Sequence, residues 1–493
     1  MRELSSPADQ KGFFFALRFV TLFAAAHVIL VFLQTNFVPM AGGWNTVWLG
    51  LELLLGLGCL CLALGFFLYA LRHRTPSLES FRELLRDIWS PGFVFLALWV
   101  VWAYIACLLA IREGWTSFYH NVRYLFYQSA DMLVLFPLGM YYGRRQLTRL
   151  LALLFDACLA LLTVLLLYGF LRFLGGEIRF DVFFGHSFDF TTLRPILGMN
   201  PNQLGSYASF FLLTGVWRFG TLRTRIGKVL LIAAEIVLMV GFAMVESRGA
   251  VIGMACSIGV GAFFLLWRQS KKGAAIRFSL SIGGCVLAMA VFLLVFYGAR
   301  TVTLSVQNRV LERVYTAQAD SLPAEETPPG RGSTLYIAPS TGVGGDQEKR
   351  DLVGSGASTM GGRKKIWLTV IRGALKDPHL LLHGVSMANT SDWVAPRFGR
   401  PMRTHNQLLE VLVAQGAPAL ALFVFWLFWL AGKSLRLLAA PVTGVHWLLP
   451  LPLLLLVAHN MLEMMLVGRP HVVSGFFYLI AGYVAGFAPK KNV

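Results

Sequence analysis

Arginine, histidine and asparagine side chains gather at the ends of long apolar runs in this sequence. The stretch RTHNQ places Arg403, His405 and Asn406 directly ahead of the apolar run 407–431. Arginine offers planar, bidentate hydrogen bonds to phosphate oxygens and keeps its charge at any physiological pH. A histidine among arginines is expected to be neutral at pH 7, because nearby positive charge disfavours the imidazolium. A neutral imidazole can accept a proton, which is the chemistry of a general base.

Three other stretches place polar side chains at similar positions. LRPILGMNPNQLGSY puts Arg194 and Asn202 ahead of an apolar run, MVESRGAVIGM puts Arg248 between two runs, and GGRKKIW puts Arg363 at the start of an amphipathic segment. Several arginines at one membrane depth predict an anionic ligand, and a lipid diphosphate headgroup lies at that depth. The sequence therefore predicts a diphosphate site built from separate elements.

Each of these residues also has a structural interpretation. Asn202, or His405 together with Asn406, can cap the helix that follows it. Arg248 in its tight turn can anchor helix ends to lipid headgroups, and the basic run 363–365 is typical of a lipid-facing surface. Taken one at a time, the residues leave these interpretations open.

The composition indicates an integral membrane protein. Hydrophobic residues make up 56% of the 493 residues and charged residues 14%, against about 25% charged residues in soluble domains. The net charge of +18 is expected from cytoplasmic loops that face anionic lipid, and not from nucleic-acid binding. All six cysteines lie in apolar runs, so neither a disulfide nor a metal site is expected. The sequence lacks nucleotide-binding and metalloprotease motifs, which predicts no cofactor.

The apolar runs predict an all-α polytopic membrane protein with about twelve transmembrane helices. A helix needs about 20 apolar residues to cross the hydrocarbon core. The runs that approach or exceed this length are 13–36, 46–71, 91–111, 127–142, 148–171, 203–217, 228–245, 249–267, 277–297, 407–431, 445–465 and 471–487. The fourth and sixth runs are short, and a re-entrant segment is the alternative for either of them.

The distribution of basic residues predicts that both termini lie in the cytoplasm. With the N-terminus inside, the short inside segments hold 21 Lys and Arg residues and the short outside loops hold 7. Basic residues are concentrated on the cytoplasmic side of membrane proteins. The predicted organisation is nine transmembrane helices over 1–297, a large periplasmic loop over 298–404 and three transmembrane helices over 405–493.

The large periplasmic loop is predicted to contain short helices. Residues 304–318 and 363–376 show helical spacing of apolar side chains. Such helices can lie in the headgroup plane or cap the helix bundle. The intervening residues 319–362 are rich in Pro, Gly, Ser and Thr, so little regular structure is expected there.

Several of these stretches resemble the bacterial O-antigen ligase and polymerase superfamily. THNQLLEVLVAQGAPALALFVFW resembles the histidine-containing signature of that superfamily, and the SRGA turn, the GR…W helix, PHLLLHGVS and NPNQLGSYASFFLL resemble other segments of it. The resemblance covers roughly residues 190–430. Pro418 stands where the family has a second glycine and is expected to bend or tighten the start of its helix. The resemblance implies a glycosyltransferase fold of the GT-C type.

The resemblance also assigns roles to individual residues. His405 matches the family's essential histidine, Arg248 matches the arginine after the serine, and Arg363 matches the arginine of the loop. We expect these three to be catalytic: the two arginines bind the diphosphate, and His405 acts as base or orients the acceptor. The residues further predicted to bind substrate are Arg194, Asn202, Arg403 and Asn406.

The function implied by the resemblance is that of an O-antigen ligase in the bacterial inner membrane. Such an enzyme transfers O-antigen polysaccharide from undecaprenyl diphosphate to a sugar hydroxyl of lipid A–core at the periplasmic face, without a metal or nucleotide. Direct displacement would invert the anomeric carbon. The implied partners are the lipid-linked donor, lipid A–core and membrane lipids. Two alternatives stay open: an O-antigen or exopolysaccharide polymerase with the same donor, and a twelve-span secondary transporter. The transporter is the less favoured of the two, because such proteins often show two related halves and no half-repeat is evident in this sequence.

Overall fold

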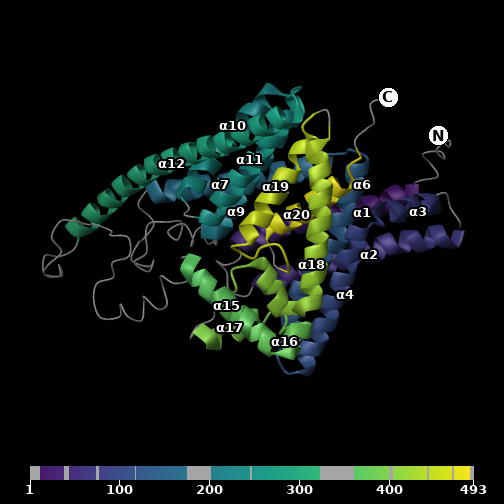
Figure 1. Cartoon of the computed structure of the whole chain (residues 1–493). Helices are drawn as coiled ribbons and strands as arrows, with labels where there is room; N and C mark the ends of the chain where they lie inside the picture. Colours follow the sequence, from purple (N-terminus) through teal and green to yellow (C-terminus); the bar gives the residue numbers. More distant parts are fainter. Residues whose placement is uncertain are drawn as a thin grey trace.

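The computed structural model of the chain is a bundle of helices joined by connections (Figure 1). It describes residues 11–37, 44–73, 77–116, 118–174, 201–244, 247–321, 360–398, 403–440, 444–468 and 471–488. These ranges contain helices and turns and no strand. The predicted all-α fold is confirmed for this part of the chain, whereas the count of twelve crossings and the GT-C fold stay predictions.

Four helices form the N-terminal part of the bundle. They are α1 (Lys11–Phe37), α2 (Trp44–His73), α3 (Ser77–Ile88) and α4 (Pro91–Arg112). Helix α4 begins where the Ser90 side chain accepts a hydrogen bond from the Phe93 amide and Pro91 occupies the first turn. Both residue types favour a helix N-terminus. The helix ends at Glu113, which is its C-cap residue.

A π-helical turn lies in the next helix at a buried carboxylate. Helix α5 (Phe118–Ala130) continues through this turn (Asp131–Leu135) into α6 (Phe136–Arg144). The Asp131 carboxylate accepts a hydrogen bond of 2.5 Å from Ser474 Oγ, and its other oxygen lies 3.5 Å from His27 Nε2. These partners offset part of the free-energy cost of burying a carboxylate in an apolar bundle.

The middle of the chain supplies five longer helices. They are α7 (Arg149–Leu174), α9 (Pro201–Thr221), α10 (Arg225–Met244), α11 (Arg248–Gln269) and α12 (Ala274–Ser321). Residues 304–318 are helical as predicted, but they continue α12 instead of forming a separate helix. The sequence has no Pro or Gly between Ala299 and Ser321 that would end the helix. The boundary predicted at residue 297 therefore falls inside one continuous helix.

Three shorter helices precede the long helix α18 (Gln407–Ala439). They are α15 (Met360–Lys376), α16 (Pro378–His383) and α17 (Thr390–Phe398). The helix predicted over 363–376 is confirmed, and its apolar residues Ile366 and Val370 are buried in a cluster with Val413 of α18. Most of the segment predicted to have little regular structure lies outside the described residues.

Helix α18 is broken at Gly416. This residue has φ +77° and ψ −178°, a conformation that glycine adopts far more readily than other residues. Pro418 has no N–H to donate to the Ala414 carbonyl four residues earlier. That carbonyl instead accepts a hydrogen bond of 2.9 Å from the Ser386 amide, which follows α16. The bend predicted for Pro418 thus takes the form of a break in the backbone of α18. The carbonyl that the break leaves without a helical partner bonds to the chain after α16.

The last two helices are shorter. Helix α19 (Pro450–Asn460) follows a 3₁₀ turn (His446–Leu448), and α20 (Val472–Gly486) comes after it. The span predicted over 445–465 extends too far, because residues 461–468 leave the helix and form a loop. Helix α20 lies backbone to backbone against α6: a β-carbon on Gly139 would clash with a main-chain oxygen of α20. Small residues permit this close approach.

Seven of the described helices are long and apolar enough to cross a membrane: α1, α4, α7, α10, α11, α12 and α18. Helix α19 with its preceding turn and α20 are shorter apolar helices. Large apolar side chains on several long helices are exposed, for example Leu230, Leu294 and Phe428. Exposed apolar surface on long apolar helices is what contact with lipid requires.

Candidate functional site

A buried carboxylate, Glu463, brings together three of the predicted site residues. It lies in the 461–468 loop, and its side chain is 8% exposed. Asn202 Nδ2 donates a hydrogen bond of 2.5 Å to Glu463 Oε1, and Arg363 Nη2 donates one of 3.0 Å to the same oxygen. His405 Nδ1 lies 3.5 Å from Glu463 Oε2. Side chains from α9, from α15 and from the residues ahead of α18 thus meet; we call these four residues the Glu463 cluster.

The surroundings of Glu463 favour its ionised form. Burial by itself raises the pKa of this carboxyl, because it disfavours the charged form. Interactions with His405, and then with His459 and Arg363, act in the opposite direction and hold the pKa below its usual value. An ionised Glu463 can therefore hold its basic neighbours in place at neutral pH.

Arg363 is held by the 461–468 loop through two contacts. Besides Glu463, the Leu462 carbonyl accepts a hydrogen bond of 2.5 Å, from Arg363 Nη1. Trp367, one turn further along α15, donates a hydrogen bond of 3.0 Å from Nε1 to the Thr404 carbonyl. Helix α15 therefore fixes both an arginine and the backbone next to His405.

The backbone turns at His405 so that its ring faces Glu463. The φ of His405 is +49°, in the left-handed region that costs a non-glycine residue about 1–2 kcal/mol. Asn406 is the N-cap of α18: its Oδ1 accepts hydrogen bonds from two amides of the first turn, and its Nδ2 donates one of 2.9 Å to the Met461 carbonyl. Asn406 thus caps the helix, whereas the His405 side chain, 28% exposed, lies beside Glu463.

A second buried carboxylate, Glu410, lies in the first turn of α18. It accepts a hydrogen bond of 2.9 Å from Thr404 Oγ1. Arg403 Nη1 lies 3.7 Å from Glu410 Oε1, and the Arg403 side chain is one-third exposed. Arg403 is therefore paired with Glu410 and not with Glu463.

Arg248 is the first residue of α11, and it is exposed. The next residue, Gly249, lies against the loop that carries Glu463: a β-carbon there would be 3.5 Å from Leu462 Cβ. The N-terminus of α11 thus borders the Glu463 cluster, and the positive end of a helix dipole favours anions. Arg194 lies outside the described residues.

Sequence reasoning did not assign a role to either carboxylate. It placed His405 among arginines, whereas the structure puts Glu463 beside the ring. A signal was present in HNMLEMMLVG, because a carboxylate in an apolar stretch is costly unless it meets a cation or hydrogen-bond donors. Arg363 is the cation that Glu463 meets, at 3.0 Å.

A group of side chains with the composition of a metal site also occurs among the described residues. It consists of Glu113, His379 and His383, and none of the three belongs to the Glu463 cluster. The expectation of no metal site rested on the cysteines, and it did not consider this combination.

Seven long apolar helices with large exposed apolar side chains among the described residues indicate a multi-pass membrane protein. Residues 230–424 match the family model described as O-antigen ligase. The match spans Arg248, Arg363 and His405, and it confirms the superfamily predicted from the motifs. Asn202 and Glu463 lie outside the matched residues. A search of the curated proteins found no match.

Proposed function

We propose that this protein is a lipid-diphosphate-dependent glycosyltransferase that acts as an O-antigen ligase. It transfers O-antigen polysaccharide from undecaprenyl diphosphate to a sugar hydroxyl of lipid A–core, in the bacterial inner membrane and at its periplasmic face. The observation that carries the proposal is the meeting of Arg363 and His405 at Glu463, in a chain that matches the O-antigen ligase family over residues 230–424.

In the proposed reaction, arginines bind the diphosphate of the donor. Arg248 is exposed at the N-terminus of α11, where both its guanidinium and the helix end favour phosphate. Arg363 adds positive charge from a position that Glu463 and Leu462 already fix. Charges fixed in advance stabilise the negative charge that develops on the departing diphosphate without a cost of reorganisation. Arg194 and Arg403 are further candidates for this contact.

His405 takes the proton of the acceptor in this proposal. With the Nδ1 hydrogen directed at Glu463 Oε2, the Nε2 atom carries a lone pair and accepts the proton from the acceptor hydroxyl. Glu463 then stabilises the imidazolium that forms, as the carboxylate of a catalytic triad does. The hydroxyl oxygen bonds to the anomeric carbon while the bond from that carbon to the diphosphate oxygen breaks. The electron pair leaves with the lipid diphosphate, and the anomeric configuration inverts.

An O-antigen polymerase is the second candidate function. The family match supports activity of the ligase or polymerase type and favours both over a secondary transporter. A polymerase would use the same donor and the same basic residues, with the end of another lipid-linked glycan as the acceptor.

The choice between the two candidates is tested with purified protein in proteoliposomes. The donor is a glycan on undecaprenyl diphosphate, the acceptors are lipid A–core and a second lipid-linked glycan, and no nucleotide is added. We expect a glycan-bearing lipid A–core on gels, with an inverted anomeric linkage by NMR. Longer lipid-linked glycans with unmodified lipid A–core would identify a polymerase. No product with either acceptor would contradict a glycosyltransferase function.

A further inference from the structure

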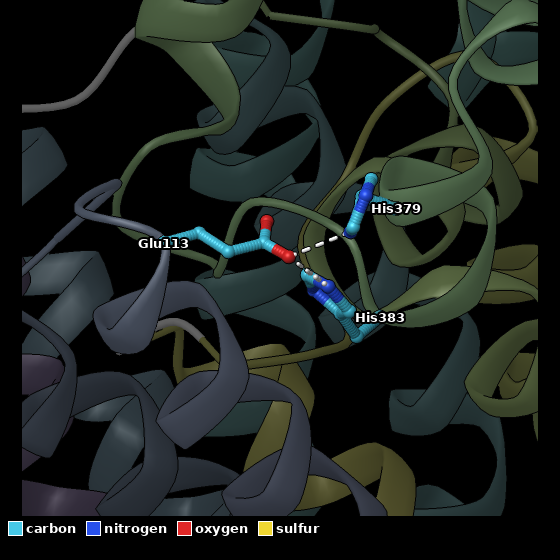
Figure 2. A group of neighbouring side chains, drawn as sticks. All are labelled: Glu113, His379 and His383. Carbon is cyan, nitrogen blue, oxygen red and sulfur yellow. Dashed lines mark hydrogen bonds and ion pairs between the residues drawn. The ribbon is translucent and has the colours of Figure 1, made fainter.

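Three side chains that commonly bind transition metals converge between α4 and α16 (Figure 2). Glu113 follows the last residue of α4, and His379 and His383 lie one turn apart on α16. Glu113 Oε1 is 2.7 Å from His379 Nδ1 and 3.1 Å from His383 Nε2. All three atoms lie within 4.8 Å of one another. Histidines four residues apart share one face of a helix, which is the spacing of helical zinc-binding pairs.

The hydrogen bonding of His383 leaves a ring nitrogen that faces a carboxylate. The side chain is 3% exposed. Its Nδ1 lies 2.8 Å from the Gly384 carbonyl, and because a carbonyl oxygen only accepts, Nδ1 carries the hydrogen. In the neutral ring, Nε2 then presents a lone pair to the Glu113 oxygen at 3.1 Å. Two acceptors at this distance repel each other unless a cation or a second proton lies between them.

We propose that Glu113, His379 and His383 bind a divalent transition metal ion, and that this ion is zinc. Imidazole nitrogens combined with a carboxylate oxygen suit Zn²⁺, whereas Ca²⁺ and Mg²⁺ prefer oxygen ligands. Bond lengths in tetrahedral zinc sites place neighbouring ligand atoms about 3.3 Å apart. The His379 side chain is 73% exposed, so its rotation can widen the 2.7 Å contact to that distance. A water molecule completes the four ligands.

The backbone around His383 supports this assignment. A metal-binding histidine usually donates its second ring N–H to a carbonyl or carboxylate, which fixes the tautomer. The Gly384 carbonyl is in that position. The following amide, of Val385, donates a hydrogen bond of 2.9 Å to the Val413 carbonyl in α18. Zinc would therefore join the end of α4 to a segment already bonded to α18, the helix that begins just after His405.

Metal content and affinity of the full-length protein in detergent test the proposal. Protein purified without chelator is expected to hold about one zinc ion per chain by mass spectrometry of the metal. After the metal is stripped, titration with ZnCl₂ is expected to restore it and to raise the Tm. Glu113→Gln and His379→Gln are each expected to weaken zinc affinity at least about tenfold. Asp392→Asn, which changes an exposed carboxylate on α17, serves as the control and keeps the wild-type affinity.

Replacing His379 removes an exposed ring, so this variant is expected to fold as the wild type does by circular dichroism. Equal zinc affinity in the wild type and in both ligand variants would overturn the proposal. Wild-type protein that cannot be reloaded with zinc would overturn it too, and would indicate a second proton on His383 in place of the metal. The glycosyl transfer proposed above does not depend on either outcome.

Discussion

Glu463 accepts hydrogen bonds from Asn202 and Arg363 and lies beside His405, so one carboxylate positions three groups from distant parts of the chain. Its replacement leaves the Arg363 guanidinium largely buried without its partner. Removing one member of a buried ion pair typically costs about 3–5 kcal/mol. Replacing Glu463 therefore acts on stability and on the candidate site together, and the two effects must be measured separately.

Replacing His405 by alanine tests its role as the proposed base. Transfer to lipid A–core is expected to fall by about 10²–10⁴-fold, the usual contribution of a general base. The Tm is expected to stay close to that of the wild type, because the partly exposed ring contacts Glu463 only at 3.5 Å. His446→Ala, a histidine that stacks on Tyr483 outside the cluster, is the matched control and should keep its transfer rate. A His405→Ala variant that transfers at the wild-type rate would remove this residue from the mechanism.

The lowered pKa of Glu463 predicts how stability depends on pH. Folding holds this pKa below its usual value of 4.5, so the native state binds the proton less tightly than the unfolded chain does. The contribution of this ionised carboxylate to the free energy of unfolding is complete above pH 4.5. It is lost as the pH falls through the lower pKa of Glu463 in the folded state. The Tm difference between the wild type and Glu463→Gln should therefore be wide at pH 7 and narrow in acid. A difference that is the same at both ends of the titration would count against this account.

At the residue scale, the structure brings three of the predicted site residues together, but the sequence did not predict what they contact. Asn202, Arg363 and His405 were expected at one face of the membrane, and all three reach Glu463. Glu463 itself was given no role, because a sequence shows the cost of a buried carboxylate but not which distant residue offsets it. The cap formed by Asn406 was among the interpretations considered, since it depends on neighbouring residues alone.

At the scale of elements, the break in α18 joins two separate motifs of the sequence. Gly416 and Pro418 free the Ala414 carbonyl, and the Ser386 amide after α16 uses it. The stretches PHLLLHGVS and AQGAPAL are therefore two sides of one contact. The apolar runs predicted α18, but they could not predict this contact, because a break is set by a single backbone conformation.

Gly416→Ala is expected to destabilise this contact. A β-carbon at Gly416 would clash with the Leu382 carbonyl, and the residue's φ of +77° is unfavourable for a side chain. Strain of this kind costs about 1–3 kcal/mol before any clash is counted, so the Tm should fall by several degrees. Gly432→Ala, later in the same helix, is the control: nothing lies within 4 Å of its β-carbon, and alanine favours a helix by about 1 kcal/mol. Equal Tm values for the two variants would contradict the break as described.

Two segment limits expected from the sequence differ from the observed helix ends, and both differences have the same physical reason. Residues 461–468 are almost all apolar, so composition alone extended the preceding span through them. Residues 304–318 are more polar, so composition alone separated them from a helix that runs on to Ser321. Helix ends depend on caps and breakers, whereas apolar content reports the environment of a segment.

At the scale of the whole molecule, the distribution of basic residues predicts which face each connection occupies. Asp392 on α17 and Arg223 between α9 and α10 are both exposed and lie on opposite faces in the predicted topology. In spheroplasts, Asp392→Cys should react with a membrane-impermeant maleimide and Arg223→Cys should react only after permeabilisation. The unsubstituted chain measures the background from its native cysteines. Reaction of Arg223→Cys in intact spheroplasts would reverse the orientation.

The partial exposure of His405 has a consequence for the energetics of repeated turnover. Each proposed transfer leaves one proton on this ring, and the ring must lose it before the next cycle. A ring that reaches solvent on its own side of the bilayer can release the proton there, and the chemistry then moves no charge across the lipid. The rate of the reaction should consequently not depend on the proton-motive force. A protonophore that collapses the gradient in proteoliposomes is expected to leave the rate of glycan transfer unchanged.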